Sequence, residues 1–265
     1  MNHRHHPSSR AGTATATLSP RPCVPVPVPT SAEVLALVHG RCFAVEYQPI
    51  IDLATGATIA HEALSRFFDE QGRSIPPAAV FAQLHEDPSL LLYVEAETKR
   101  IQIEHAPHGP LHLNVDPDSF HAGRNGRGGN ALLDVLQSHD EQVVVEVIET
   151  MSFADARLGR EFVRALRARQ MVVALDDVGA PDSLLSLETL KEADVLKLDA
   201  SWLLRIADPR ERVILEALLD LARRLGARTV LEGVETAAQL ETANALGVDA
   251  VQGFLYRGQF TTRAA

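Results

Sequence analysis

Acidic and amide side chains recur in this sequence at the ends of short apolar runs. The pattern is carried by Glu62, Asn114, Glu146, Glu149, Asp176, Asp177, Glu232 and Glu235, and a lysine, Lys197, ends another such run. One acid at the end of one strand would carry little information, but a closed barrel brings the ends of its strands to a single face. Carboxylates gathered there repel one another strongly enough to require a cation. The sequence therefore predicts a metal-dependent enzyme.

The elements that must position these side chains alternate between strand-like and helix-like patterns. The strand patterns cover residues 43–50, 58–65, 111–115, 143–148, 172–176, 195–198, 228–232 and 250–252. Residues 52–56 join the first two and are too few for a crossover helix, so we expect an antiparallel hairpin there and parallel strands after it. The sequence thus predicts an α/β fold, a (β/α)8 TIM-like barrel with an antiparallel first hairpin.

The helical pattern is clearest over residues 211–226. We expect its apolar side chains to form one face that packs on the core, and Gly226 to end the helix as a C-cap. The residues of this predicted face are Val213, Ile214, Ala217, Leu218, Leu221, Ala222 and Leu225.

Length and composition fit one such barrel behind a tail. With 265 residues and 46% hydrophobic content, the chain can bury the core of a single large domain. Residues 1–30 are rich in His, Ser, Thr, Ala and Pro, a composition that favours disordered chain over packed structure. We therefore expect a disordered tail over 1–30 and a barrel domain over 31–262.

Charge and cysteine content limit the partners and the compartment. The formal net charge of -10 excludes a protein that coats a nucleic-acid polymer, because such surfaces are basic. Cys23 and Cys42 are too few for a disulfide framework or a cysteine metal site. Neither a signal peptide nor a membrane-spanning apolar stretch is evident. We expect a soluble protein of the reducing cytoplasm, without a membrane partner.

Eight blocks of the sequence resemble the EAL-domain family of cyclic dimeric GMP (c-di-GMP) phosphodiesterases. They are Tyr-Gln-Pro-Ile at 47–50, Glu-Ala-Leu-Ser-Arg at 62–66, Asn-Val-Asp-Pro at 114–117, Glu-Val-Ile-Glu at 146–149, Asp-Asp-Val-Gly at 176–179, Lys-Leu-Asp at 197–199, Glu-Gly-Val-Glu-Thr at 232–236 and Gln-Gly-Phe at 252–254. Any one block is a weak signal. All eight blocks occur in the same order as in the family, and they lie at the predicted strand ends. This distinguishes the resemblance from a chance match.

The resemblance implies a metal centre of two divalent ions. Glu62, Asn114, Glu146 and Asp176 match the positions that hold one ion, and Asp176 would bridge to a second ion with help from Asp177. Oxygen ligands without cysteine favour Mg²⁺ or Mn²⁺ over Zn²⁺. Two ions about 3.5–4 Å apart can supply a nucleophile at neutral pH and stabilise both the attacking and the leaving oxygen of a phosphodiester.

The resemblance also implies roles around that centre. Lys197 matches the residue that orients the attacking water, and Glu232 matches the acid that assists its deprotonation or holds it through the second ion. Gln252 matches an amide that lines the site. Gln48 and Arg66 match substrate-binding positions. The implied reaction is hydrolysis of c-di-GMP to linear pGpG, which lowers the level of this second messenger.

One loop departs from the family pattern. Active members usually carry a hydroxyl residue and a second glycine where this chain has Ala180 and Pro181, so a hydrogen bond and backbone freedom are both lost. Glu149 matches the acid that holds this loop, and Glu235 also resembles a residue whose hydrogen bonds fix loops and ligands. We therefore expect low activity, or activity that depends on a partner.

Three functions are open at this point: a working phosphodiesterase, an inactive c-di-GMP receptor and a protein-binding scaffold. A receptor should have lost a metal ligand, and a scaffold should also have lost Gln48 and Arg66, yet all of these positions match. The enzyme is thus favoured. A homodimer and an outside protein regulator are also open.

Two further residues are expected to be structural. His112 shares the strand face of Asn114, where a barrel-lining or hydrogen-bonded histidine is expected because the oxygen ligands are already complete. Trp202 is expected to pack in the core or in an interface.

Overall fold

The computed structural model describes residues 29–40, 42–69, 71–126, 128–138, 142–148, 153–181 and 183–264. Most of the tail predicted over residues 1–30 lies outside the described residues. Among the described helices, none combines the length and the apolar character needed to cross a membrane.

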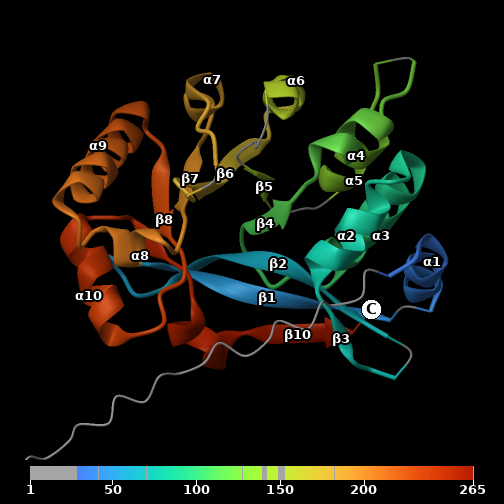
Figure 1. Cartoon of the computed structure of the whole chain (residues 1–265), viewed down its shortest axis with the longest axis horizontal. Coiled ribbons are helices and arrows are strands. Elements are labelled where there is room, and N and C mark those ends of the chain that lie inside the picture. The colour runs from blue at the N-terminus through green and yellow to red at the C-terminus, as the bar shows by residue number, and fades with distance from the viewer. Residues whose placement is uncertain are drawn as a thin grey trace, which may run out of the picture.

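Eight strands close into a barrel, as predicted (Figure 1). Its strands are β1 (Phe43–Asp52), β2 (Thr58–Phe68), β4 (Leu111–Asn114), β5 (Val143–Ile148), β6 (Val172–Val178), β7 (Val195–Leu198), β8 (Arg228–Leu231) and β9 (Ala250–Val251). Around the barrel the order is β1, β9, β8, β7, β6, β5, β4 and β2, and the pairing of β2 with β1 closes it. Each strand coincides with one of the predicted runs to within three residues at either end.

Strand directions also match the prediction. β1 runs antiparallel to both of its barrel neighbours, β2 and β9, whereas the pairs from β2 round to β9 are parallel. The β1–β2 hairpin turns at Gly56, whose φ of 70° a residue with a side chain rarely adopts. Asp52 stabilises that turn because its Oδ1 accepts a hydrogen bond from Thr55 N at 2.9 Å.

Two short strands lie outside the barrel and were not predicted. β3 (Ser74–Ile75) pairs with the end of β2, and β10 (Thr261–Ala264) runs antiparallel along β1. Figure 1 shows β10 lying beside β1, at the end of the chain.

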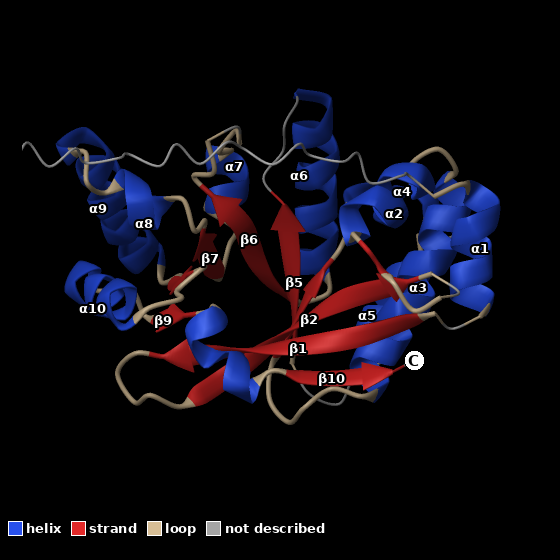
Figure 2. Ribbon diagram, turned by 60° about the horizontal axis from the view of Figure 1, so that its bottom comes forward, coloured by secondary structure: helices blue, strands red, loops and turns tan. Residues whose placement is uncertain are grey.

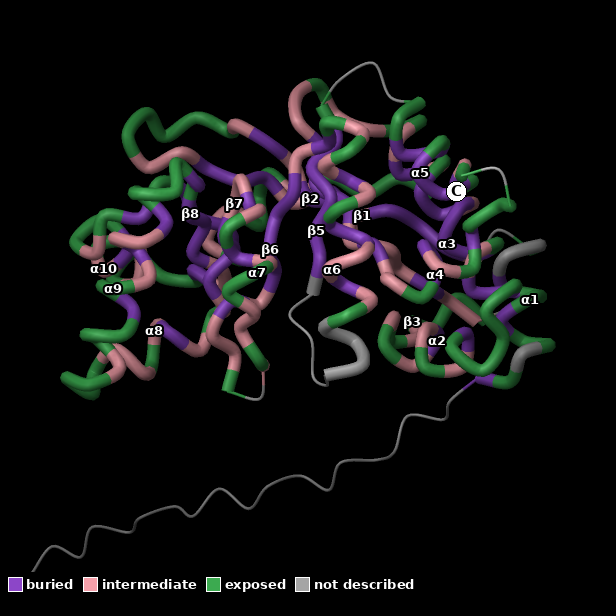
Figure 3. Tube along the Cα trace, turned by 90° about the horizontal axis from the view of Figure 1, so that it is seen from above, coloured by how far each residue is buried: buried purple, intermediate pink, exposed green. Residues whose placement is uncertain are grey.

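In Figure 2 most helices lie above and to either side of the strands, whereas β1 and β10 run along the lower edge. The helices are α1 (Ser31–His39), α2 (Pro77–Leu84), α3 (Pro88–Glu104), α4 (Pro117–Ala122), α5 (Ala131–Leu136), α6 (Phe153–Ala168), α7 (Leu187–Leu190), α8 (Trp202–Arg205), α9 (Pro209–Leu225), α10 (Ala237–Leu246) and the 3-10 helix η1 (Phe254–Gln259). In Figure 3 the strands are mostly buried and the exposed residues lie mainly on the outer helices and loops.

Aspartate–proline pairs begin three of these helices. Asp87, Asp116 and Asp208 each cap a helix by accepting hydrogen bonds from backbone N–H groups of its first turn, and a proline follows each of them. Proline suits that first position because its missing N–H would have no partner there. Sequence-local chemistry thus sets where α3, α4 and α9 start.

The predicted core face of α9 is wrong in four positions. Val213 and Ile214 are 64% and 50% exposed, and Ala217 and Leu225 are exposed as well. The buried side chains of this helix are Leu215, Leu219 and Ala222, with the predicted Leu218 and Leu221 partly buried beside them. The helix meets the barrel along a stripe centred on Leu215 and Leu219, so the helix is rotated about its axis from the predicted orientation. Gly226 ends the helix with φ 75°, as predicted.

Candidate active site

Strand register brings the predicted site residues to one place. Gln48 of β1 stands opposite Glu62 of β2, and Glu62 stands opposite His112 of β4. One step further round, Asn114 at the end of β4 stands opposite Glu146 of β5. Side chains of adjacent strands in register share a face, so residues up to fifty positions apart become neighbours.

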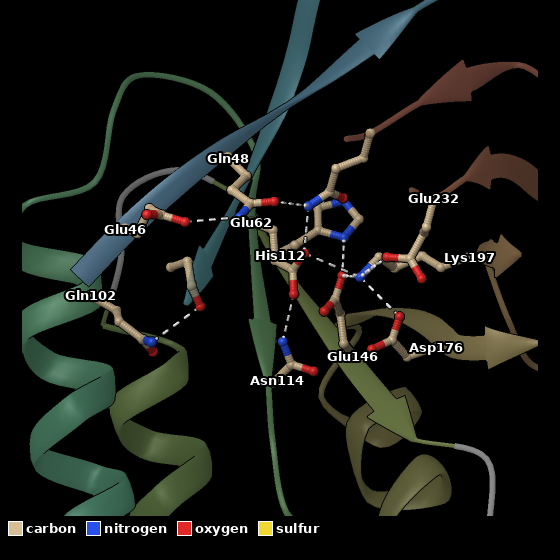
Figure 4. A network of polar contacts seen from close by, with 12 residues as sticks. Glu46, Gln48, Glu62, Gln102, His112, Asn114, Glu146, Asp176, Lys197 and Glu232 are labelled. Atoms are coloured by element: carbon tan, nitrogen blue, oxygen red, sulfur yellow. Dashed lines mark hydrogen bonds and ion pairs between the residues drawn. The ribbon is translucent and has the colours of Figure 1, made fainter. Parts of the chain in front are cut away.

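Lys197 of β7 stands at the centre of the acidic cluster (Figure 4). It is 1% exposed. Its Nζ lies 2.8 Å from Glu146 Oε1, 2.9 Å from Asp176 Oδ1, 3.0 Å from Glu232 Oε1 and 3.4 Å from Glu62 Oε2. Four strands and the end of a fifth contribute to this contact set. One ammonium group therefore faces four carboxylates in the interior of the barrel mouth.

The cluster raises the pKa values of both Lys197 and Glu146. Burial alone would lower the pKa of Lys197, but Glu146, Glu62, Glu232 and Asp176 raise it well above its ordinary value. Lys197 is thus a cation at neutral pH. Burial, with the charges of nearby acids, raises the pKa of Glu146 well above its ordinary value despite Lys197.

Glu62 differs from Glu146 because neutral donors surround it. Its Oε1 accepts a hydrogen bond from Asn114 Nδ2 at 2.7 Å, and its Oε2 accepts one from Gln252 Nε2 at 2.6 Å. Burial opposes ionisation of this carboxyl, but Lys197 and these donors lower its pKa to about 2. Glu62 is therefore held as a carboxylate. The bond from Asn114 uses its nitrogen, so its carbonyl oxygen is the atom that it can offer to a cation.

Asp176, Asp177 and Glu232 form a second, more open group. Ligand atoms of these three residues all lie within 4.8 Å of one another. Burial and the charges of Asp176 and Asp199 raise the pKa of Asp177 to about 6. Burial, opposed by Lys197 and supported by Asp176, raises the pKa of Glu232 to about 8. Burial is the largest cause of both shifts and the neighbouring carboxylates add to it, so a cation bound here would stabilise the ionised forms.

His112 is buried and bonded within the cluster. Its Nδ1 lies 2.9 Å from Glu146 Oε1, and burial together with Lys197 lowers its pKa to about 3. A neutral ring bonded in this way donates its Nδ1–H to the carboxylate. His112 therefore has the hydrogen bond expected for a structural histidine, and it leaves Glu146 Oε2 as the oxygen directed elsewhere.

Three buried polar atoms of the cluster have no hydrogen-bond partner among the described residues, although one of them, Asp176 Oδ1, is paired with the Lys197 ammonium group. The other two are Glu146 Oε2 and Gln252 Oε1. A buried acceptor without a donor is costly, and such atoms in a native site indicate an ion or an ordered water that satisfies them. The carboxylate and amide oxygens of this cluster therefore fit a hard divalent cation with bound water.

The two predicted substrate-binding residues share an acidic neighbour that the sequence did not indicate. Glu46 Oε1 accepts hydrogen bonds from Arg66 Nη2 at 2.7 Å and from Gln48 Nε2 at 2.9 Å. Gln48 is joined to the cluster because its Oε1 accepts a bond from Gln252 Nε2 at 3.3 Å. Glu46 lies two residues before Gln48 on β1, so period-two alternation was the signal that could have found it.

The remaining predicted residues are Glu149 and Glu235. Glu149 lies outside the described residues. Glu235 is exposed, and its backbone N–H donates to Gln239 Oε1 at 2.8 Å beside the capping box that begins α10.

Comparison with known proteins places the chain in a family. The EAL domain model matches residues 32–258. Protein y4lL of Sinorhizobium fredii is 27% identical over 222 residues, which cover 81% of this chain and 26% of y4lL. PdeG of Escherichia coli, named a probable cyclic di-GMP phosphodiesterase, is 30% identical over 222 residues, which cover 79% of this chain and 43% of PdeG. The chain thus spans less than half the length of either relative.

A solved structure agrees with this placement. The PaMucR phosphodiesterase, in complex with c-di-GMP, superimposes with a TM-score of 0.69 and 25% sequence identity, covering 84% of this chain and 94% of that one. This chain belongs to the EAL domain family.

Proposed function

We propose that this protein is a divalent-cation-dependent phosphodiesterase that hydrolyses c-di-GMP to linear pGpG. The observation that carries the proposal is the convergence of four carboxylates on Lys197 at the strand ends of an EAL barrel, with Asp177 as a fifth carboxylate beside Asp176 and Glu232. Family membership supports the substrate. The cluster supports catalysis rather than binding alone, because a receptor gains nothing from such a concentration of uncompensated charge.

The charge balance of the cluster supports the cation requirement. Lys197 can neutralise only one of the five carboxylates, and a substrate that carries two phosphates adds further negative charge. Glu62, Asn114, Glu146 and Asp176 would hold one cation, and Asp176 with Asp177 would hold a second. When bound, two such ions lower the pKa of a water molecule and stabilise charge on the attacking and leaving oxygens.

The protein's own groups would then orient the reactants. Lys197 is held protonated, so it donates hydrogen bonds to an attacking oxygen rather than removing its proton. Glu232 lies at the more open side of the cluster, with its side chain 18% exposed, and would accept that proton once a bound cation lowers its raised pKa and holds it as a carboxylate. Gln252 Oε1 has an unused acceptor directed into the site. These three residues would fix one oxygen in position for in-line attack.

Gln48 and Arg66 would bind the nucleotide beside this centre. Arg66 donates hydrogen bonds from Nη2 to Glu46 and from Nη1 to Ser65 O, the latter at 3.2 Å. Its remaining N–H groups suit a phosphate oxygen. The amide of Gln48 can both donate to and accept from a base.

The test is hydrolysis of c-di-GMP by the purified full chain, with products separated by chromatography. We expect pGpG to form with Mg²⁺ or Mn²⁺ and not after treatment with a chelator. Ca²⁺ should inhibit, because its larger radius and looser coordination spoil the in-line geometry. Folded protein that binds the dinucleotide but leaves it intact with Mg²⁺ and Mn²⁺ would show a receptor, and protein that binds no dinucleotide would show a scaffold.

A further inference from the structure

The backbone bulges where β6 presents its two aspartates. Pairing with β7 is regular up to Leu175 and resumes at Val178, so Asp176 and Asp177 stand in a break of the register. Asp177 has φ 53° and Gly179 has φ 82°. Left-handed backbone is unfavourable for a residue with a side chain, and such a conformation persists only where its surroundings impose it.

Trp202 of α8 imposes part of this path. Its Nε1 donates a hydrogen bond of 2.9 Å to Val178 O, which also accepts one from Asp199 N at 3.3 Å. The indole is 1% exposed and lies directly over Gly179, where an added Cβ would stand 2.5 Å from the ring. The ring therefore fixes the carbonyl of Val178, the first residue after the two aspartates. It also leaves room only for a glycine at position 179.

Arg205 of α8 holds the next carbonyl. Its Nη1 donates a hydrogen bond to Gly179 O, and its guanidinium carbon lies 4.1 Å from the centre of the Trp202 ring. Glu211 of α9 pairs with the same guanidinium, because its Oε2 accepts a hydrogen bond from Arg205 Nη2. Stacking on the ring and pairing with the acid leave Arg205 little freedom. We call Trp202, Arg205 and Glu211 the loop brace.

The residues that follow the bulge cannot provide such support. Ala180 and Pro181 have no side-chain donor, and Ala180 ends a turn in which its backbone N–H donates to Asp177 O at 3.0 Å. The side-chain contacts that hold carbonyls 178 and 179 both come from α8, which follows β7 in the chain.

We propose that Trp202 and Arg205 are positioning residues of the cation site, because they hold the bulge that directs the carboxylate of Asp177 toward Asp176 and Glu232. The proposal rests on the proposed function. In this chain the brace replaces the hydrogen bonding that the residues at 180 and 181 do not offer, and the affinity for the second cation depends on it.

Cation binding without nucleotide tests the proposal. We expect calorimetric titration of the full chain with Mn²⁺ to show two binding events, with Asp177→Asn removing the weaker one. Trp202→Phe keeps a ring over Gly179 but loses the N–H donor, so it should weaken that event about fivefold, the value of one hydrogen bond. Arg205→Met should have a similar effect, and Arg205→Lys, which can still donate to Gly179 O, a smaller one.

A matched control separates positioning from stability. Phe162 of α6 is fully buried and packs against Phe120, so Phe162→Leu should lower the melting temperature without changing either cation affinity. Binding constants of Trp202→Phe equal to those of the wild type would overturn the proposal. So would a loss of affinity in Phe162→Leu as large as in Trp202→Phe.

The indole supplies an independent readout because Trp202 is the single tryptophan of the sequence. Its fluorescence should change during a Mg²⁺ titration over the concentrations of the weaker binding event, and Asp177→Asn should abolish that change. Fluorescence that follows the stronger event instead would contradict the assignment. Protein that shows these cation effects but does not hydrolyse c-di-GMP would refute the proposed function and leave the brace intact.

Discussion

Two lysines buried among acids show how differently this fold uses buried charge. Lys197 of β7 faces four carboxylates, and they raise its pKa well above the ordinary value. Lys99 of α3 lies 3.8 Å from Glu95 Oε1, and its burial outweighs that attraction, so its pKa is lowered. The two side chains are about equally buried, at 1% and 3% exposed. The number and arrangement of the acids therefore decide the difference.

The Lys99 cluster is satisfied by the chain itself. Glu95 Oε1 accepts a hydrogen bond from Asp116 N at 2.9 Å, and Glu95 Oε2 accepts one from Ser119 Oγ. These bonds fix the start of α4 just after Asn114. Glu146, by contrast, keeps an oxygen without a partner among the described residues. Buried charge alone does not mark a cation site, whereas acids in excess of their protein partners do.

The largest expected effect is that of Glu62→Ala. This change removes a proposed ligand and the carboxylate that organises Asn114 and Gln252, so hydrolysis should fall below detection. Calorimetry with Mn²⁺ should show the stronger binding event lost. If Glu62→Ala still bound Mn²⁺ with wild-type affinity, the cation site would lie elsewhere.

Lys197→Met should reduce turnover by roughly a hundredfold to a thousandfold, which is typical for loss of one oriented donor. Cation and substrate binding should largely persist, because Lys197 is not a proposed ligand. Without divalent cations the variant should also melt at a lower temperature, since four buried carboxylates lose their ammonium group, and Mg²⁺ should restore the loss. Near-normal turnover would show that Lys197 does not orient the reacting oxygen.

Lys99→Met should cost about 3 kcal/mol of folding free energy, because it leaves Glu95 buried without its counter-charge. Urea unfolding monitored by circular dichroism measures this loss. Mg²⁺ should not diminish the loss, in contrast to Lys197→Met, and the double variant Glu95→Gln with Lys99→Met should recover part of it. If Mg²⁺ restored the free energy of unfolding of the Lys99→Met single variant, the proposed difference between the two clusters would be wrong.

The smallest expected effect is that of Ala180→Thr combined with Pro181→Gly, which restores the residues usual in the family. It should raise turnover or lower the required metal concentration by roughly twofold, because the loop brace already holds the bulge through more than one hydrogen bond. Metal titrations of the hydrolysis rate, run side by side with the wild type, measure the change. Titration curves that coincide would show that the brace compensates fully.

The barrel was predictable because its signals are local. Apolar runs of strand length alternate with helical patterns, and the loop at residues 52–56 is too short for a helix, so strand number and direction followed from sequence. The side of α9 that faces the core did not follow. Val213 and Ile214 are apolar yet exposed, because the docking angle of the helix on the barrel sets the buried stripe. β10 was missed because the polar segment Thr261–Ala264 becomes a strand only by pairing with the edge of β1.

By itself the sequence determined that Glu62, Asn114, Glu146 and Asp176 lie on neighbouring strands, since each belongs to an apolar run whose position in the strand order is readable. Only the tertiary structure decided what surrounds them. His112 on Glu146, Glu46 on Arg66 and Trp202 over Gly179 are contacts between residues that are 20 or more positions apart. Barrel closure and helix docking create these contacts, and no local pattern in the chain encodes the angles at which those elements meet.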